Sequence, residues 1–321
     1  MRLLFVILAH DRPEAAAALA AALTDGATDA RALIHFDARA DAASFERLAA
    51  AAAGQDRVRL AAERVATPWG RWGLVQATLD ALEEARGWGR AGDGWTPDRA
   101  LLLSGACLPC RPVRALERFL RAHPRREFIE AGPASWIKGG IKEERYRHWF
   151  PFDFRAQRRL HHLFHQAQRI LGVERRVPDG LIPRFGSQWW GLTWETCLKL
   201  LAHRVAHPDH MRWFRWSWIP DEFAIQTLVA ALVPAGRIEG RGLTHAPFDD
   251  DGRPVVFFDD HEAYVRSLDA FFFRKASPEA TRLRAVAMEA ARQDDDGAPV
   301  RLDGRAGEDH ALRAQALGAY G

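Results

Sequence analysis

Two adjacent carboxylates in the second half of the chain are the strongest candidates for chemistry. Asp221 and Glu222 follow Pro220 and precede an apolar run that predicts a helix. Acidic residues are common at a helix start, because the free N–H groups and the dipole favour them there, so the pair also fits an ordinary helix cap. Trp216 and Trp218 come just before. Indole faces beside a carboxylate suit sugar binding and general base catalysis.

A second aromatic and polar segment, Gly186-Ser187-Gln188-Trp189-Trp190, comes shortly before this one and is expected to reach the same site. Glu222 could take a proton from an acceptor hydroxyl as that oxygen attacks an anomeric carbon. A departing nucleotide diphosphate then needs positive charge. Arg253 and Lys275 could supply it without a metal, although each also fits a solvated surface cation, and Arg274 competes with Lys275 for this role.

Metal ligation is the main alternative to this arrangement. The run Asp249–Asp251 could act as an Asp-x-Asp metal-binding pair, but Asp-Asp-Asp-Gly is also a good polar turn. His161 and His165, like His203 and His207, have the spacing that puts two imidazoles on one helix face. The sequence offers neither pair a third ligand, so we expect ordinary helical histidines and no metal site.

Two further motifs have ordinary explanations. Cys107 and Cys110 form a C-x-x-C after a predicted strand, but outside the small thioredoxin-like setting of a redox pair, so buried structural thiols are expected. Basic and aromatic residues alternate over residues 142–150, as in single-strand nucleic-acid binders. Glu143 and Glu144 interrupt this positive run, and a net charge of +3 is low for such a protein, so we expect no nucleic acid as a partner.

The elements that must position these residues alternate between strand and helix. Short apolar strands separated by amphipathic helices predict an α/β fold with a mainly parallel sheet flanked by helices on both faces. The predicted strands cover residues 3–8, 32–36, 57–60, 100–104, 127–130, 189–192 and 255–258. The predicted helices cover residues 13–23, 42–53, 73–84, 113–122, 194–202, 221–231, 263–271 and 278–292.

Ligands of such sheets lie outside the carboxyl ends of the strands. This rule places His10, Asp37 and Ser104 on one rim of the sheet. The region of about 136–184 is rich in Arg, His, Phe and Trp, and we expect it to be an excursion over the sheet rather than a separate domain.

The composition bounds the class of protein. The chain has 321 residues, 48% hydrophobic and 27% charged, as in a globular protein, with 12 Trp and only 3 Tyr. The apolar run from Leu3 to Ala9 is too short for a membrane span and predicts a buried strand of a cytoplasmic protein. We expect one catalytic domain over residues 1–277, with the insertion at about 136–184, and then a C-terminal helix and a loosely ordered tail over 278–321.

Eight motifs, in this order, resemble the core-2/I-branching β-1,6-N-acetylglucosaminyltransferases and the related peptide O-xylosyltransferases. The resemblance covers roughly residues 3–276, and no motif is decisive alone. The matching segments are Val6-Ile7-Leu8-Ala9-His10, Ile34-His35-Phe36-Asp37, Trp69-Gly70-Arg71-Trp72-Gly73-Leu74-Val75, Leu102-Leu103-Ser104-Gly105, Lys142-Glu143-Glu144-Arg145, Gly186-Ser187-Gln188-Trp189-Trp190, Pro220-Asp221-Glu222 and Phe273-Arg274-Lys275.

The resemblance implies a GT-A-like (Rossmann-like) fold and an inverting transfer from a UDP-sugar, with no cofactor and no catalytic metal. It assigns the base to Glu222 and the diphosphate to Arg253 and Lys275, and it puts His10 and Asp37 against the uridine. The acceptor side would be lined by Glu130, Lys142, Arg145, Trp189, Trp190 and Asp221.

The same resemblance implies UDP-N-acetylglucosamine or UDP-xylose as the donor. We expect the acceptor to be a glycan or a lipid-linked saccharide, met by a bacterial-type cytoplasmic enzyme peripherally at the inner membrane face. One departure is Cys107, which stands where the family commonly has an Asp. A metal-dependent transferase that uses Asp249–Asp251, and a non-catalytic UDP-sugar- or glycan-binding module, remain as alternatives.

Overall fold

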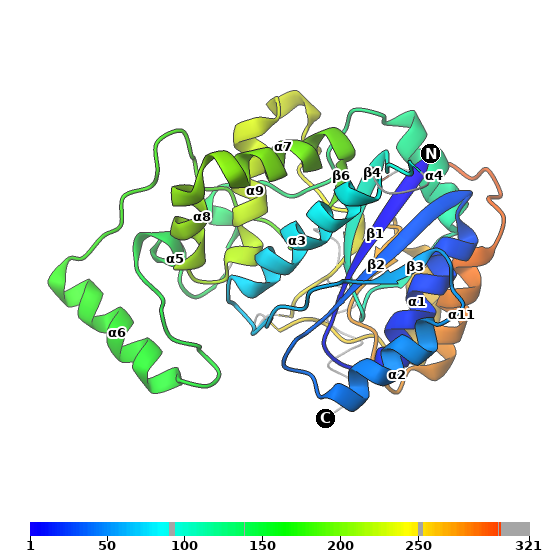
Figure 1. Cartoon of the computed structure of the whole chain (residues 1–321), viewed down its shortest axis with the longest axis horizontal. Coiled ribbons are helices and arrows are strands. Elements are labelled where there is room, and N and C mark those ends of the chain that lie inside the picture. Colours follow the sequence, from blue (N-terminus) through cyan, green and yellow to red (C-terminus); the bar gives the residue numbers. More distant parts are fainter. Residues whose placement is uncertain (90–93, 138, 250–252, 301, 303–321) are drawn as a thin grey trace.

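Five strands form the central sheet of the protein, which the computed structural model describes over residues 1–89, 94–137, 139–249, 253–300 and 302 (Figure 1). Their order is β3-β2-β1-β4-β6, with β6 antiparallel to β4 and the other neighbours parallel. The order 3-2-1-4 of the parallel strands is that of Rossmann-like folds, so the predicted fold class is confirmed. The strands are β1 Arg2–Ala9, β2 Asp29–Phe36, β3 Val58–Leu60, β4 Arg99–Ser104 and β6 Gly191–Thr193.

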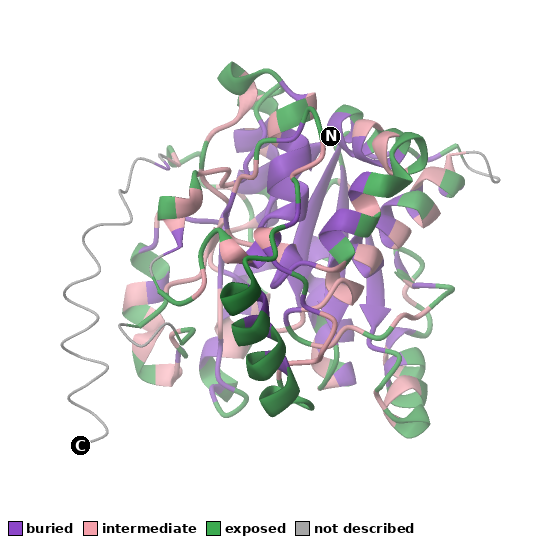
Figure 2. Ribbon diagram, turned by 90° about the vertical axis from the view of Figure 1, so that its left-hand side faces the viewer, coloured by how far each residue is buried: buried purple, intermediate pink, exposed green. Residues whose placement is uncertain are grey.

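Helices cover both faces of this sheet. On one side α1, α2 and α11 gather, and on the other lie α3, α7 and α9, with the buried strands between them (Figures 1 and 2). Every residue of β4 is buried, as expected of a parallel strand with helices above and below. The longer helices are α1 Pro13–Gly26, α2 Ala42–Ala52, α3 Gly73–Trp88, α4 Val113–Ala122, α6 Arg158–Leu171, α7 Trp194–Ala206, α8 Pro208–Arg215, α9 Ala224–Leu232 and α11 Thr281–Arg292. None of the helices in the described residues is both long and apolar enough to cross a membrane.

A second, small sheet brings the C-terminal part of the chain to the end of β4. It has the order β5-β8-β7, with β5 Leu108–Pro109, β7 Thr244–His245 and β8 Phe272–Phe273. Because β5 follows β4 closely and β8 pairs with it, the next two residues, Arg274 and Lys275, lie close to the carboxyl end of β4.

The insertion runs over the sheet only in part, since Ile137, Tyr146 and Leu181 join the main core while α6 does not (Figure 1). It carries α5 (Glu144–Arg147) and α6, and α6 lies at the outer edge of the molecule, away from the central strands and largely exposed (Figures 1 and 2). One face of α6 is nevertheless buried. There Gln168 accepts a hydrogen bond from the Trp149 amide at 2.7 Å and donates one to the Trp149 carbonyl at 2.9 Å, which ties α6 to the segment after α5.

Two predicted strands are wrong, because their residues make only isolated bridges to distant segments instead of a continuous ladder. Residues 127–130 make only isolated bridges, and the buried Glu127 carboxylate instead accepts hydrogen bonds from Thr193 and Thr196 at the start of α7. Residues 255–258 likewise form only an isolated bridge, between Phe257 and Ala276.

Several predicted helices begin or end elsewhere, and two of them bear on the site or on the second sheet. The predicted helix 221–231 begins only at Ala224, because Pro220–Glu222 form a separate 3-10 turn. The φ of 50° at Ile219 turns the chain just before this segment. The predicted helix 263–271 is shorter, with α10 covering Glu262–Ser267, since the following phenylalanines form β8. The final helix is present as α11, whereas the expected loose tail falls mostly on residues 303–321, outside the described residues.

Candidate active site

The rim predicted from the strand ends is present. Strand β1 pairs in register with β2 and β4, so that Ala9 lies opposite Phe36 and Leu8 opposite Ser104. The Asp37 amide donates to the Ala9 carbonyl at 2.8 Å. The ends of the three strands therefore bring His10, Asp37 and Ser104 together at one edge of the sheet.

Asp37 and His10 differ in how far they can reach a ligand. The Asp37 carboxylate is buried and accepts hydrogen bonds from Arg39 at 2.7 Å and from Thr67 at 2.8 Å. Burial alone would raise the pKa of Asp37, but these hydrogen bonds outweigh it and hold the pKa below its usual range. The His10 side chain is exposed at the rim. The uridine contacts expected of both residues remain predictions.

Backbone pairing joins the segments that carry the two predicted diphosphate ligands. The Lys275 amide donates to the Val255 carbonyl at 3.3 Å, and the Phe257 amide donates to the Lys275 carbonyl at 2.9 Å. Arg253 lies two residues before this pairing, and its amide donates to Asp249 Oδ1 at 2.7 Å. The rest of the proposed metal-binding run, Asp250 and Asp251, lies outside the described residues.

Glu222 is held by two segments that are distant from it in the chain. Its Oε2 accepts a hydrogen bond from Arg145 Nη1 at 2.6 Å, and its carbonyl accepts one from the Gly186 amide at 2.9 Å. Arg145 is only 9% exposed, and its carbonyl accepts from the Trp218 amide at 2.8 Å. Glu222 itself is 24% exposed, so its carboxylate is fixed in direction and still reachable from solvent.

The neighbouring Asp221 has a different environment from Glu222. Its Oδ1 is buried and has no hydrogen-bond partner in the described part of the chain. Burial raises the pKa of Asp221 to about 7, and the charge of Glu222 acts in the same direction. Because Asp221 stays protonated close to neutral pH, it can donate a hydrogen bond, whereas an ionised carboxylate can only accept one.

We expect Asp221 to make the protein less stable as the pH rises. The folded protein holds the Asp221 proton up to about pH 7, whereas the unfolded chain loses it near pH 4. Between these values the folded state binds more protons, so the free energy of unfolding falls by up to about 1.4 kcal/mol per pH unit. The free energy of unfolding is measured by urea titration at several pH values from 4.5 to 8. Its decrease with rising pH should be smaller for Asp221→Asn than for wild type. The exposed control Asp56→Asn should keep the wild-type slope, and an unchanged slope in Asp221→Asn would contradict the assignment.

Glu130, predicted to face the acceptor, lies close to this pair. Its Oε2 accepts from Trp136 Nε1 at 2.7 Å and from the Ser187 amide at 3.1 Å. Burial raises the pKa of Glu130 despite these hydrogen bonds, and the nearby Glu222 raises it further. Lys142, also predicted on the acceptor side, is exposed just before α5. The contacts of Glu130 and Lys142 with the acceptor remain predictions.

Gly186 makes the approach of these carboxylates possible. A Cβ at this position would lie 2.3 Å from the Glu130 carbonyl oxygen and 2.6 Å from the Glu130 Cβ. Only glycine therefore fits between the segments that carry Glu130 and Glu222.

We expect Gly186→Ala to destabilise the fold by about 1–3 kcal/mol, the usual cost of overpacking, because the backbone of Glu130 must move. The control is Gly87→Ala in α3, where a Cβ meets nothing within 4 Å and should stabilise the helix slightly. Urea unfolding of both variants measures the difference. Equal stability of the two variants would show that the close approach is not needed.

The two tryptophans of this region are buried. The Arg274 guanidinium lies over the Trp189 ring, 4.7 Å from its centroid, and Arg274 Nε donates to Ser104 Oγ at 3.3 Å. Arg274 thus links the end of β4 to the aromatic segment. The sequence indicated Arg274 only as an alternative to Lys275 and did not predict this role. Trp190 is 2% exposed. Contact of these two rings with the acceptor remains a prediction, and Trp190 has little surface for it.

The segment at Trp69-Gly70-Arg71 positions the Glu222 turn, a role that the sequence reasoning missed. The Ile219 amide donates to the Gly70 carbonyl at 3.2 Å, and the Trp69 and Trp218 rings meet edge to face with centroids 5.3 Å apart. Gly70 has a φ of 69°, which favours glycine. The aromatic residues before Pro220 therefore support the turn that carries Glu222.

The cysteine pair has the environment of structural thiols. Cys107 is buried and lies 3.3 Å from Ser104 Oγ, and the Cys110 thiol donates to the Ala270 carbonyl. Burial raises the pKa of both thiols, that of Cys110 to about 12, so the reactive thiolate is disfavoured.

Comparison with known families settles what kind of protein carries this arrangement. The model of the Core-2/I-branching enzyme family matches residues 4–266. The chain belongs to this family. It is therefore a glycosyltransferase, as the motifs predicted, and the matched region contains the rim residues, Glu130, Arg145 and Glu222.

Other similarities are weaker or partial. Two solved structures of the galactosyltransferase LgtC align with the fold. One, in complex with donor and acceptor sugar analogues, has a TM-score of 0.41 and 11% identity over 92% of this chain and 98% of that chain. The other, an active-site mutant, has a TM-score of 0.39 and 12% identity over 99% and 95%. Human Protein ABHD15 is 40% identical over 82 residues, which are 24% of this chain and 17% of that protein, so the match spans less than a fifth of this relative.

Proposed function

We propose that the protein is an inverting, metal-independent glycosyltransferase that moves N-acetylglucosamine or xylose from a UDP-sugar to a hydroxyl group. The acceptor would be a glycan or a lipid-linked saccharide, met at the inner face of the membrane. The main support, besides family membership, is the environment of Glu222. Its carboxylate is oriented by Arg145, is partly exposed, and stands beside two carboxyl groups with raised pKa values.

The proposed reaction is a single in-line displacement. Arg145 occupies Oε2 of Glu222, which leaves Oε1 to take the proton of the acceptor hydroxyl. The acceptor oxygen forms its bond to C1 of the donor sugar as the bond from C1 to the UDP oxygen breaks. Attack from the face opposite the leaving group inverts the configuration at C1.

The departing diphosphate must be stabilised by positive charge. Arg253 and Lys275 are suited to this role because backbone pairing joins their segments near the carboxyl end of β4. Two fixed cations can stabilise the developing charge in place of a metal ion. Arg274 is less available, because it is already engaged by Trp189 and Ser104.

Slow hydrolysis of the donor tests this function without knowledge of the acceptor, since water can replace the acceptor hydroxyl. The purified protein is incubated with UDP-N-acetylglucosamine, UDP-xylose or UDP-glucose, and the release of UDP is followed by a coupled assay. We expect release from one of the first two donors without added metal. Binding of a UDP-sugar with no release, with or without a glycan acceptor, would instead identify a non-catalytic binding module.

A further inference from the structure

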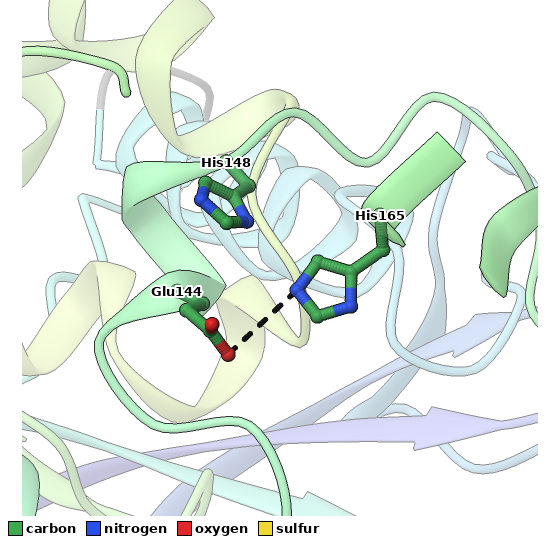
Figure 3. A group of neighbouring side chains, drawn as sticks. All are labelled: Glu144, His148 and His165. Atoms are coloured by element: carbon green, nitrogen blue, oxygen red, sulfur yellow. Dashed lines mark ion pairs between the residues drawn. The ribbon is translucent and has the colours of Figure 1, made fainter. Parts of the chain in front are cut away.

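Three side chains outside the Glu222 site form a cluster where the insertion folds back on itself. Glu144 lies on α5, His148 directly follows it, and His165 comes from α6 (Figure 3). Each offers one ligand atom such that all three atoms lie within 4.8 Å of one another. Glu144 Oε2 is 3.7 Å from His165 Nε2. The helical spacing paired His165 with His161 and predicted no metal site there, whereas the structure groups His165 with Glu144 and His148.

Each of the two imidazoles has one buried nitrogen atom that makes no hydrogen bond within the described part of the chain. These atoms are His148 Nδ1 and His165 Nε2. Both rings are themselves buried, with His148 5% and His165 6% exposed. Buried polar atoms without a partner are costly, and a bound metal ion is one of the few ways to satisfy them.

The donor set suits a transition metal. Two imidazole nitrogens and one carboxylate form the three-ligand set of many zinc sites, with a fourth position left for water. Arg169 also contacts Glu144, but through Oε1 at 3.4 Å, so it leaves Oε2 facing His165. Glu144 is 38% exposed, which gives an ion a path from solvent.

We propose that Glu144, His148 and His165 bind a divalent transition-metal ion of the zinc class. The ion would fasten α6 to α5, next to Arg145, the residue that holds Glu222. It would be an anchor of the insertion, separate from the diphosphate, and it takes no part in the transfer step.

The test must distinguish the proposed site from a second group of side chains that could bind a metal ion. This group consists of His207, Asp209 and His210. His207 and Asp209 are exposed, and His210 Nδ1 already pairs with His203 Nε2 at 3.0 Å, so this group has weaker claims. The measurements are therefore made on the full chain carrying His207→Gln. Replacing this exposed histidine is not expected to affect folding.

The experiment measures zinc binding after the protein has been stripped with a chelator and dialysed. Competition with a chromogenic chelator gives the dissociation constant, and the thermal midpoint is measured with and without Zn²⁺. We expect one equivalent to bind and to raise the midpoint. His165→Gln and Glu144→Gln should each raise the dissociation constant for zinc by more than about tenfold. Loss of a residue that only supports a metal ligand already costs at least about tenfold in affinity, and loss of a ligand itself should cost more. The matched control is His162→Gln, an exposed histidine on the same helix, which should bind zinc unchanged.

Two outcomes would overturn the proposal. The His207→Gln protein could bind no zinc, or His165→Gln and Glu144→Gln, both folded by circular dichroism, could bind it as tightly as their parent. Both readouts concern metal binding alone, so they stand whether or not the chain transfers a sugar.

Discussion

Glu222→Gln should lower the turnover number of sugar transfer by about 10²–10⁴-fold, the usual contribution of a general base. The amide cannot accept the proton of the attacking hydroxyl, but its oxygen can still accept the hydrogen bond from Arg145 that holds the side chain at 2.6 Å. Binding of UDP should therefore change little. Turnover is measured as UDP release or sugar transfer, and UDP affinity by calorimetry on the same preparation.

Two variants make this result specific. Glu46→Gln changes an exposed glutamate on α2 and should keep full activity. Glu130→Gln tests the other glutamate close to Glu222. If Glu222→Gln keeps most of its activity while Glu130→Gln loses it, then the base is Glu130 and the assignment to Glu222 is wrong.

Lys275→Ala should weaken UDP binding and slow transfer together. A hydrogen bond to a charged group contributes about 1.5–3 kcal/mol, so UDP affinity should fall about 10- to 100-fold. Turnover should fall further, because the charge on the diphosphate oxygen grows as the bond to the sugar breaks. Calorimetry with UDP and steady-state kinetics measure the two effects separately.

The matched control is Lys199→Ala, a partly exposed lysine on α7 that is paired with Glu195. It should leave both UDP affinity and turnover unchanged. Lys275→Arg keeps the positive charge and should restore part of the affinity. Full activity in Lys275→Ala would show that other side chains bind the diphosphate, and Arg274 would be the first of these to test.

The sheet could be predicted from sequence because its central strands are continuous apolar runs. Residues Leu3 to Ala9 are all buried in β1, and the register of β1 with its neighbours then fixes the rim. Prediction failed at 127–130, where the apolar pattern resembles a strand, but the buried Glu127 turns its carboxylate to the start of α7. Such a contact spans 66 residues and leaves no local pattern.

The site was predicted in part, and for a similar reason. The motifs placed Arg145 and Glu222 in one site, but their ion pair joins residues 77 positions apart, which no local spacing reveals. The cluster of Glu144, His148 and His165 was missed because His165 reaches the other two only after α6 folds back. The Trp69–Arg71 segment was recognised as a motif, and its support of the Glu222 turn is visible only in three dimensions.

Calorimetry of UDP-sugar binding tests the central claim most directly. UDP, UDP-N-acetylglucosamine, UDP-xylose and UDP-glucose are titrated in buffer with excess chelator, and again with Mg²⁺ or Mn²⁺ in place of the chelator. We expect UDP-N-acetylglucosamine or UDP-xylose to bind with the same affinity in both conditions, since Arg253 and Lys275 would hold the diphosphate. Binding that requires Mg²⁺ or Mn²⁺ would contradict the metal-independent mechanism and turn attention to Asp249–Asp251.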